Sequence, residues 1–176
     1  MVCISLTYMG LSTMNGYSRE DLDHYACASH QRAGHAWEQG YFDQSVLPVR
    51  DSLGTVLLER DEHIRPATTP DDLAALQPAF AKIGATMGFN GVALQRYPQL
   101  GHIEHLHTAA TSSGIVDGAG LVLLGSADAA ERHNLTPRAR LKSFVSVGSE
   151  PVLMLDGPTP ACNRALELAG LKARDI

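Results

Sequence analysis

Hydrophobic and polar positions repeat with a helical period most clearly after Ser18. Ser18 is a good N-cap residue, and Asp21 stands where the acid of a capping box belongs. Gly40 is placed to end the helix in a left-handed conformation. The pattern therefore predicts a helix between these residues. Its expected apolar face consists of Leu22, Tyr25, Ala26, Ala33, Ala36 and Trp37.

Three shorter helices follow from the same pattern. One begins at Thr69 or Asp71 and is broken by Pro78, which cannot continue a helix. Two more are expected at residues 126–132, after the N-cap Ser126, and at 160–169. The buried side of the first is expected to consist of Leu73, Leu76 and Phe80.

Strand patterns are shorter and less regular. Residues 45–50 and 54–59 predict two short strands around a tight turn. Residues 83–110 show no clear period and are interrupted by glycine and proline. We expect them to form a long loop, with one short strand at 92–95.

The stretch Ser112–Ala119 and the apolar run 121–124 form the centre of the predicted fold. Before them the sequence is polar and irregular, and after them strand and helix patterns alternate. The run 121–124 is continuously apolar, as in a strand buried on both faces. Residues 139–147 alternate as a second strand. The chain is therefore expected to have an α/β fold, in which the loop before the strand at 121–124 either lines a pocket or is a tight turn without a ligand.

Composition and charge exclude several classes of partner. The 176 residues are 44% hydrophobic and carry a formal net charge of −5. No broad basic field is present, so we expect neither nucleic acid nor a membrane as a partner. Cys3, Cys27 and Cys162 are far apart, which argues against a disulfide framework. The N-terminal residues lack the features of a signal peptide, and a cytoplasmic location is expected.

One cluster of side chains could bind a metal ion. His102, Glu104, His105 and His107 lie within six residues and offer ligands that first-row metals accept. Their spacing fits neither of the common His-Glu zinc motifs. The alternative is that these are solvated histidines of a loop. No phosphate-binding glycine loop and no nucleophile elbow occurs in the sequence.

The order of short motifs resembles that of the thiolases, the family of acyl-CoA acetyltransferases. The resemblance covers nearly the whole chain. The motifs are Tyr8-Met9-Gly10, Ser18-Arg19-Glu20-Asp21, Gly40-Tyr41-Phe42-Asp43, Asp61-Glu62-His63-Ile64-Arg65-Pro66, Leu76-Gln77-Pro78-Ala79-Phe80, Ser113-Gly114-Ile115-Val116-Asp117-Gly118-Ala119, Leu135-Thr136-Pro137-Arg138-Ala139-Arg140 and Gly157-Pro158-Thr159-Pro160-Ala161. Residues 91–98 look like an insertion of a thiolase subgroup that is associated with acyl-CoA and sterol breakdown.

The resemblance implies a domain division and a binding site. Residues 1–110 would form the thiolase loop domain over the coenzyme A (CoA) site. Residues 111–137 would end the N-terminal half of the core, and residues 138–176 would begin its C-terminal half. CoA would be a substrate, with no separate cofactor. The CoA-lining positions would be Met9, Arg65, Phe80, Ser113, Gly114 and Met154.

The sequence departs from the family at the catalytic motifs. It contains neither the Cys-Ala-Ser-Gly nucleophile, nor the Gly-His-Pro histidine, nor the second catalytic cysteine, nor the Asn-Glu-Ala-Phe segment. We therefore expect a thiolase fragment that keeps CoA-pocket residues and is inactive alone, because no acyl-enzyme can form. The alternative is a non-catalytic CoA-binding or interaction module that pairs with a complementary thiolase chain. A homo-oligomer is also expected as a possible assembly.

Overall fold

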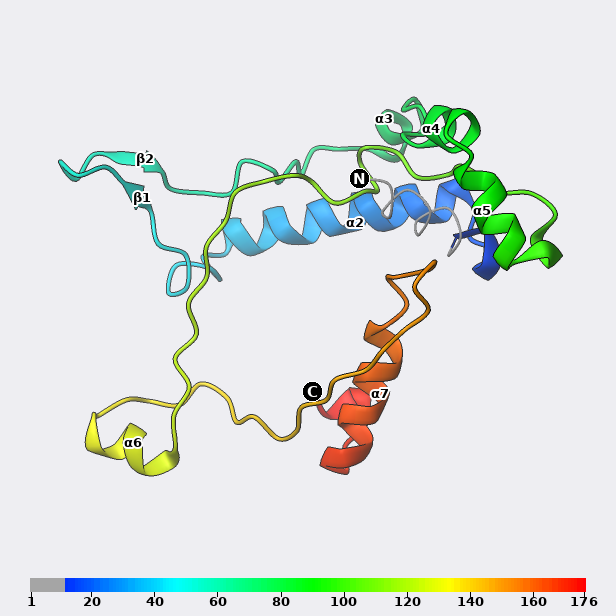
Figure 1. The fold of residues 1–176 in the computed structure, drawn as a ribbon. Coiled ribbons are helices and arrows are strands. Elements are labelled where there is room, and N and C mark those ends of the chain that lie inside the picture. The colour runs from blue at the N-terminus through cyan, green and yellow to red at the C-terminus, as the bar shows by residue number, and fades with distance from the viewer. Residues whose placement is uncertain (1–11) are drawn as a thin grey trace. The chain divides into compact units, whose positions relative to one another are not determined.

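The computed structural model describes residues 12–176. The chain divides into two compact units, Met1–Ser113 and Gly114–Ile176. The first unit is organised along a single long helix, α2 (Arg19–Glu38), which is drawn in blue in Figure 1. The second unit carries shorter elements.

Helix α2 begins and ends where the sequence predicts. The Ser18 hydroxyl accepts from the backbone N–H of Asp21, and the Asp21 carboxylate accepts from the backbone of Ser18. This capping box satisfies two backbone donors that have no partner within the helix. Gln39 is the C-cap, and Gly40 follows with φ +68°. The predicted helix is confirmed.

The buried side of α2 shares only Ala26 with the predicted apolar face. Asp23, Ala26, Cys27 and Gly34 are buried, whereas Tyr25 is 77% exposed. Small residues lie on the buried side because other segments approach the helix backbone closely there. Ala26 and Cys27 pack with Leu73 in one core cluster. Size at the contact, rather than hydrophobicity, determines which face is covered.

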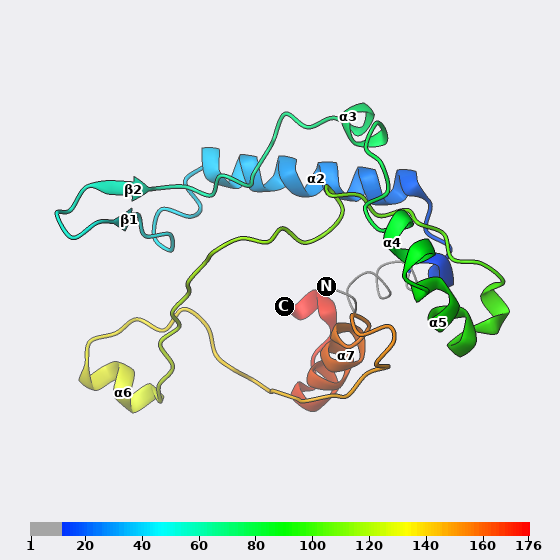
Figure 2. The ribbon, with the colours of Figure 1, turned by 45° about the horizontal axis from the view of Figure 1, so that its top comes forward.

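A β-hairpin follows the helix, as predicted. Strands β1 (Val49–Arg50) and β2 (Val56–Leu58) pair antiparallel, with Val49 opposite Leu58. The Asp51 carboxylate accepts from two backbone amides and fixes the turn between the strands. Figures 1 and 2 show the hairpin beyond the C-terminal end of α2.

Helix α3 (Pro70–Ala74) lies beside the N-terminal half of α2 (Figure 2). Thr69 and Asp72 form a second capping box, and the helix ends before Pro78. Leu73 is 4% exposed, as expected. Leu76 is 37% exposed, so the prediction that it is buried is wrong. Helix α3 ends at Ala74, so Leu76 lies beyond the helix whose buried side it was predicted to share.

The prediction of a long loop at residues 83–110 is wrong in its first half, and the short strand predicted at 92–95 is part of a helix. Residues 81–100 form α4 (Ala81–Thr86), α5 (Phe89–Arg96) and the 3₁₀ helix η1 (Pro98–Leu100). Gly88, with φ +76°, turns the chain between α4 and α5. Short helices of this kind depend on tertiary packing more than on intrinsic propensity. The residues packed together here are Ala93, Ile103, Phe80, Leu94 and Leu100.

The second unit contains the two helices that the sequence predicts there. Helix α6 (Ala127–Arg132) begins at Ser126, whose hydroxyl accepts from the Ala129 amide. Helix α7 (Pro158–Ala169) has Gly170 as a left-handed C-cap and is followed by the 3₁₀ helix η2 (Ala173–Asp175).

The two strands predicted in the second unit do not form. Residues 121–124 are extended and unpaired, and each of these side chains is at least 76% exposed. Residues 139–147 are also without strand pairing, with Phe144 84% exposed. A strand requires a neighbour that accepts and donates backbone hydrogen bonds, and within residues 12–176 no segment pairs with these two. In the same range, no helix is both long and apolar enough to cross a membrane.

Candidate functional site

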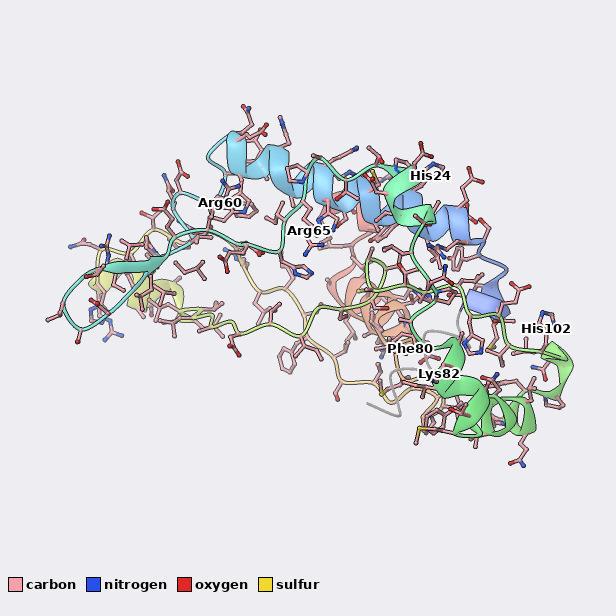
Figure 3. The ribbon with its side chains drawn as sticks, turned by 90° about the horizontal axis from the view of Figure 1, so that it is seen from above. His24, Arg60, Arg65, Phe80, Lys82 and His102 are labelled. Atoms are coloured by element: carbon pink, nitrogen blue, oxygen red, sulfur yellow. The ribbon has the colours of Figure 1, made fainter. Side chains whose placement is uncertain are left out.

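Arg65 lies on the connection that leaves the hairpin and runs along α2 (Figure 3). Its backbone N–H donates to Nδ1 of His30 on α2 at 3.3 Å. The Asp61 carboxylate accepts from the His63 amide just before it, and Thr68 N–H donates to the Arg65 carbonyl after it. The backbone of Arg65 is therefore fixed by turns on both sides, while its guanidinium is exposed to solvent.

Phe80 is half-buried at the start of α4, on the core cluster formed by Ala93 and Ile103. The Ala79 amide donates to the His107 carbonyl at 2.9 Å, which ties this segment to the chain that precedes Ser113. The exposed part of the Phe80 ring can contact an apolar ligand. The buried part fixes its position.

Ser113 and Gly114 are exposed and follow a tightly hydrogen-bonded turn. Thr108 is fully buried, its amide donates to Thr111 Oγ1 at 2.9 Å, and its carbonyl accepts from Ser112 Oγ at 2.7 Å. The turn presents Ser113 at the end of the first unit and Gly114 at the start of the second.

Met154 has an unusual backbone conformation for a residue with a side chain. Its φ is +53°, its amide donates to the Glu150 carbonyl at 2.7 Å, and the preceding Leu153 is 6% exposed. Left-handed backbone conformations at non-glycine residues carry strain and are often found at functional sites. The Met154 side chain is 37% exposed.

The six predicted CoA-lining residues are distributed over both units. Arg65, Phe80 and Ser113 belong to the first unit, and Gly114 and Met154 belong to the second. Met9 lies outside the described residues. The grouping of these residues into one CoA pocket therefore stays a prediction, as do the three predicted domain segments.

The three histidines that could have bound a metal ion do not converge. His102 lies 3.4 Å from Glu104 at the surface, His105 contacts Asn90 Nδ2 at 3.1 Å, and His107 contacts a different partner. Within residues 12–176, no three His, Cys, Asp or Glu side chains converge as metal ligands would. The three imidazoles are neighbours in sequence, but the backbone turns each of them toward a different part of the first unit.

Burial affects the two inner histidines of this segment. Desolvation lowers the pKa of His105 below its ordinary value. It lowers the pKa of His107 as well, and the contact of that ring with the Thr111 carbonyl partly offsets the effect. Burial therefore favours the neutral form of both rings.

The two described cysteines are free thiols in different surroundings. Cys27 is buried, its Sγ donates to the Thr68 carbonyl at 3.1 Å, and it accepts from Gln31 Nε2 at 3.4 Å. Cys162 is exposed on α7. Packing and hydrogen bonding of Cys27 indicate a structural role for this side chain.

The sequence analysis missed a hollow of about 480 Å³ beside the C-terminal end of α2. We call it the aromatic hollow. Its lining includes Trp37, Phe42, Glu38, Asp43, Glu59 and Arg60. None of the five described CoA-lining residues is among those that line it. The sequence did contain a signal for it. Trp37 and Phe42 stand on either side of the turn after α2, and each is followed directly by an acidic residue, Glu38 or Asp43.

Comparisons with known proteins place the chain in a family. The family model described as "Thiolase, N-terminal domain" matches residues 3–94. The mitochondrial 3-ketoacyl-CoA thiolase of Rattus norvegicus is 37% identical over 175 residues, covering 98% of this chain and 39% of the relative. The 3-ketoacyl-CoA thiolase of Cronobacter sakazakii is 40% identical over 176 residues, covering 98% of this chain and 40% of the relative.

Solved structures agree with the sequence relatives. The crystal structure of human mitochondrial 3-ketoacyl-CoA thiolase matches with a TM-score of 0.77 and 34% identity, covering 98% of this chain and 38% of that chain. The same enzyme in complex with CoA matches with a TM-score of 0.76 and 33% identity, covering 98% of this chain and 37% of that chain. The chain thus spans about two fifths of the length of these relatives. The predicted thiolase-like α/β fold is confirmed, and the chain belongs to the thiolase family.

Proposed function

We propose that this chain provides the CoA-binding part of a thiolase-family acyltransferase of fatty acid degradation. The observation that carries the proposal is the match, over 98% of the chain, to a thiolase solved in complex with CoA. The relatives named above are 3-ketoacyl-CoA thiolases, so we infer a CoA thioester of a 3-keto acid as the substrate of the assembled enzyme. A reducing compartment such as the cytoplasm suits the two free thiols.

The described residues offer suitable chemistry for CoA. The exposed guanidinium of Arg65, on a backbone fixed by its neighbours, can donate to a phosphate of the nucleotide part. The exposed part of the Phe80 ring and the Met154 side chain can pack against the pantetheine arm. Ser113 can donate a hydrogen bond, and Gly114 permits close approach of a ligand to the backbone.

The acyl-transfer step requires groups that this sequence does not contain. A thiolase forms an acyl-enzyme on a cysteine, and neither of the two described cysteines stands in the family's nucleophile motif. Cys27 is also buried and hydrogen bonded. We therefore propose that the chain binds CoA by itself, and that acyl transfer depends on residues from a further segment of polypeptide.

Thermal unfolding with and without CoA tests this function. A ligand that binds only the folded chain raises the unfolding temperature. We expect CoA to raise it more than pantetheine, which lacks the nucleotide phosphates. Arg65→Ala should weaken CoA binding about tenfold and leave pantetheine binding unchanged, because one charge-assisted hydrogen bond is lost.

Arg132→Ala, which removes an exposed arginine of α6, is the matched control and should behave like the wild type. If CoA does not change the unfolding temperature of the wild-type chain, the proposed function is wrong. If CoA binds and Arg65→Ala has no effect, the function stands and the assignment of Arg65 is wrong.

A second function is favoured by the exposed apolar run at residues 121–124. Four neighbouring large apolar side chains, each at least 76% exposed, are unusual on the surface of a monomeric protein. The unpaired backbone of this run can add to a sheet of another chain. The alternative proposal is therefore an interaction module that pairs with a complementary thiolase chain, or with a second copy of itself.

Size-exclusion chromatography with light scattering, alone and with a thiolase fragment that lacks the matched part, separates these assemblies. Val122→Lys should abolish pairing, because it places a charge within the apolar run. Leu53→Lys changes an equally exposed residue in the hairpin turn and should leave pairing intact. A strictly monomeric wild-type chain that does not bind the fragment excludes this second function.

A further inference from the structure

The aromatic hollow beside the C-terminal end of α2 has the features of a binding site for a cation. The Trp37 and Phe42 rings lie with their centroids 5.3 Å apart, at an angle of 49°. Both side chains are half-buried, so their positions are held by packing while part of each ring faces the hollow. Its volume of about 480 Å³ is within the range of small-ligand pockets.

We propose that the aromatic hollow binds an organic cation on an apolar stem, namely an alkylguanidinium or alkylammonium group. The Trp37 ring already has such a group over it. The Cζ atom of Arg60 lies 5.7 Å from the centroid of the ring, within the distance of a cation–π contact. Arg60 belongs to the connection that leaves β2, as Figure 3 shows.

The charges around the hollow support a cation and disfavour an anion. Glu38, Asp43 and Glu59 line it, and Arg60 is the one cationic side chain among the described lining residues. Within residues 12–176, none of the three carboxylates forms an ion pair. Three carboxylates against one guanidinium give the hollow a negative potential, which attracts a cation and repels the phosphates of CoA.

The walls of the hollow are held by close backbone packing. Gly34 lies against Pro66 so closely that a methyl group in place of its hydrogen would overlap the proline ring. Gly40, with φ +68°, turns the chain after α2, and the Asp43 amide donates to its carbonyl at 3.2 Å. The turn places the Asp43 carboxylate at the edge of the hollow. The segments on both sides of Trp37 are therefore fixed.

Arg60 occupies the position that a ligand cation would take over Trp37. It is exposed and forms no ion pair with any residue of 12–176, so it can move away when a ligand enters. Removing Arg60 should strengthen the binding of a cation, because the ligand no longer competes with an internal guanidinium and the site loses a positive charge.

The experiment uses Trp37 as its reporter, because it is the only tryptophan of the chain. Trp37 fluorescence is followed while the full chain is titrated with agmatine, a free alkylguanidinium that also carries a terminal ammonium, and separately with the capped peptide Gly-Arg-Gly, which carries one positive charge. We expect a saturable change that weakens with added salt. The tighter of the two ligands shows whether the site prefers a free cation or an arginine side chain of a partner protein.

Variants test the role of each charge. Arg60→Ala should lower the dissociation constant for agmatine about twofold to fivefold, the factor expected for one exposed cation–π contact. Glu38→Gln and Glu59→Gln should each raise it by a similar factor. Glu20→Gln, at the other end of the same helix and outside the hollow, is the matched control and should leave it unchanged.

If neither ligand changes the Trp37 signal, or if Arg60→Ala weakens agmatine binding, the proposal is wrong. A titration with CoA in the same assay separates this site from the proposed function. CoA should not displace agmatine, and agmatine should not reduce the thermal stabilisation by CoA. Displacement in either direction would show that the hollow is part of the CoA site and overturn the assignment to a cation.

Discussion

Arg19 and Asp23 form an ion pair within α2, in which Nε of Arg19 donates to Oδ2 of Asp23 at 2.7 Å. The same guanidinium reaches the end of α3 and the turn after it, where Nη2 donates to the carbonyls of Leu73 at 2.6 Å and Leu76 at 3.0 Å. One arginine therefore binds a carbonyl of α3 and a carbonyl just beyond it, and neutralises an aspartate that is buried against it. This explains why Asp23 lies on the packed side of the helix.

Arg19→Ala should destabilise the first unit strongly. It leaves the Asp23 carboxylate, which is 4% exposed, without its cationic partner, and it removes the donor to two carbonyls. Loss of one partner of a buried pair costs about 3 kcal/mol of unfolding free energy. Asp23→Ala should cost less, because Arg19 is 24% exposed and can be hydrated.

Urea unfolding followed by far-ultraviolet circular dichroism measures both effects. Arg32→Ala is the control, since Arg32 is an exposed arginine of the same helix. The assigned role of Arg19 is wrong if Arg19→Ala is no more destabilising than Arg32→Ala. It is also wrong if Asp23→Ala lowers the unfolding free energy more than Arg19→Ala does.

Two glycines inside helices should respond in opposite ways to alanine. Gly34→Ala forces a methyl group into Pro66, and we expect a loss of about 1–3 kcal/mol of unfolding free energy. Gly91→Ala in α5 meets nothing within 4 Å, and alanine favours helices, so it should stabilise by up to about 1 kcal/mol. The same urea experiment checks both, and equal effects would rule out close packing of Pro66 on α2.

Local signals in the sequence were sufficient to predict the helices and the turn whose ends are fixed by their own side chains. Ser18 and Asp21, or Thr69 and Asp72, satisfy the first amides of their helices without help from distant residues. The same holds for Asp51 in the hairpin turn. Such elements can be predicted because both partners of each hydrogen bond lie within four residues of each other.

Elements that depend on distant partners could not be predicted in this way. Helices α4 and α5 have no side-chain N-caps and are held by a cluster that includes Ile103, so their sequence alone resembles a loop. Residues 121–124 have the composition of a buried strand, but a strand also needs a neighbour. Sequence composition reports the preferred environment of a segment and does not supply its partner.

The candidate site shows the same limit. The exposure of Arg65 and the partial burial of Phe80 suit the roles that the thiolase resemblance implies. The aromatic hollow escaped prediction because it combines Trp37 with Arg60, which are 23 positions apart and meet only through the hairpin. The opposite holds for His102, His105 and His107. They are close in sequence, but each contacts a different partner, so they do not come together as metal ligands.

His107 is expected to make the stability of the first unit depend on pH. Its Nε2 lies 2.6 Å from the Ser12 hydroxyl, and its Nδ1 lies 3.2 Å from the Thr111 carbonyl. A carbonyl only accepts, so Nδ1 carries the proton and Nε2 accepts from Ser12. Burial lowers the pKa of His107 below its ordinary value of 6.5, and that of His105 as well. A second proton on His107 would break this arrangement, because Nε2 could no longer accept.

The direction of the pH dependence follows from the linkage between proton binding and folding. The unfolded chain binds a proton at each of these histidines as the pH falls through about 6.5, while the folded chain does not until a lower pH. The unfolding free energy should therefore be greatest above pH 6.5. It should decrease as the pH falls toward the lowered pKa values, by at most about 1.4 kcal/mol per pH unit for each proton.

Urea unfolding between pH 8 and pH 5 tests this expectation. His107→Gln should be less stable than the wild type at pH 8, because the substitution removes the hydrogen bonds of the neutral ring. Its unfolding free energy should also decrease less toward pH 5. His24→Gln removes an exposed histidine of α2 and should keep the slope of the wild type. If His107→Gln retains the full slope, a group other than His107 causes the pH dependence. If the wild type becomes more stable toward pH 5, the assignment of a neutral, hydrogen-bonded ring to His107 is wrong.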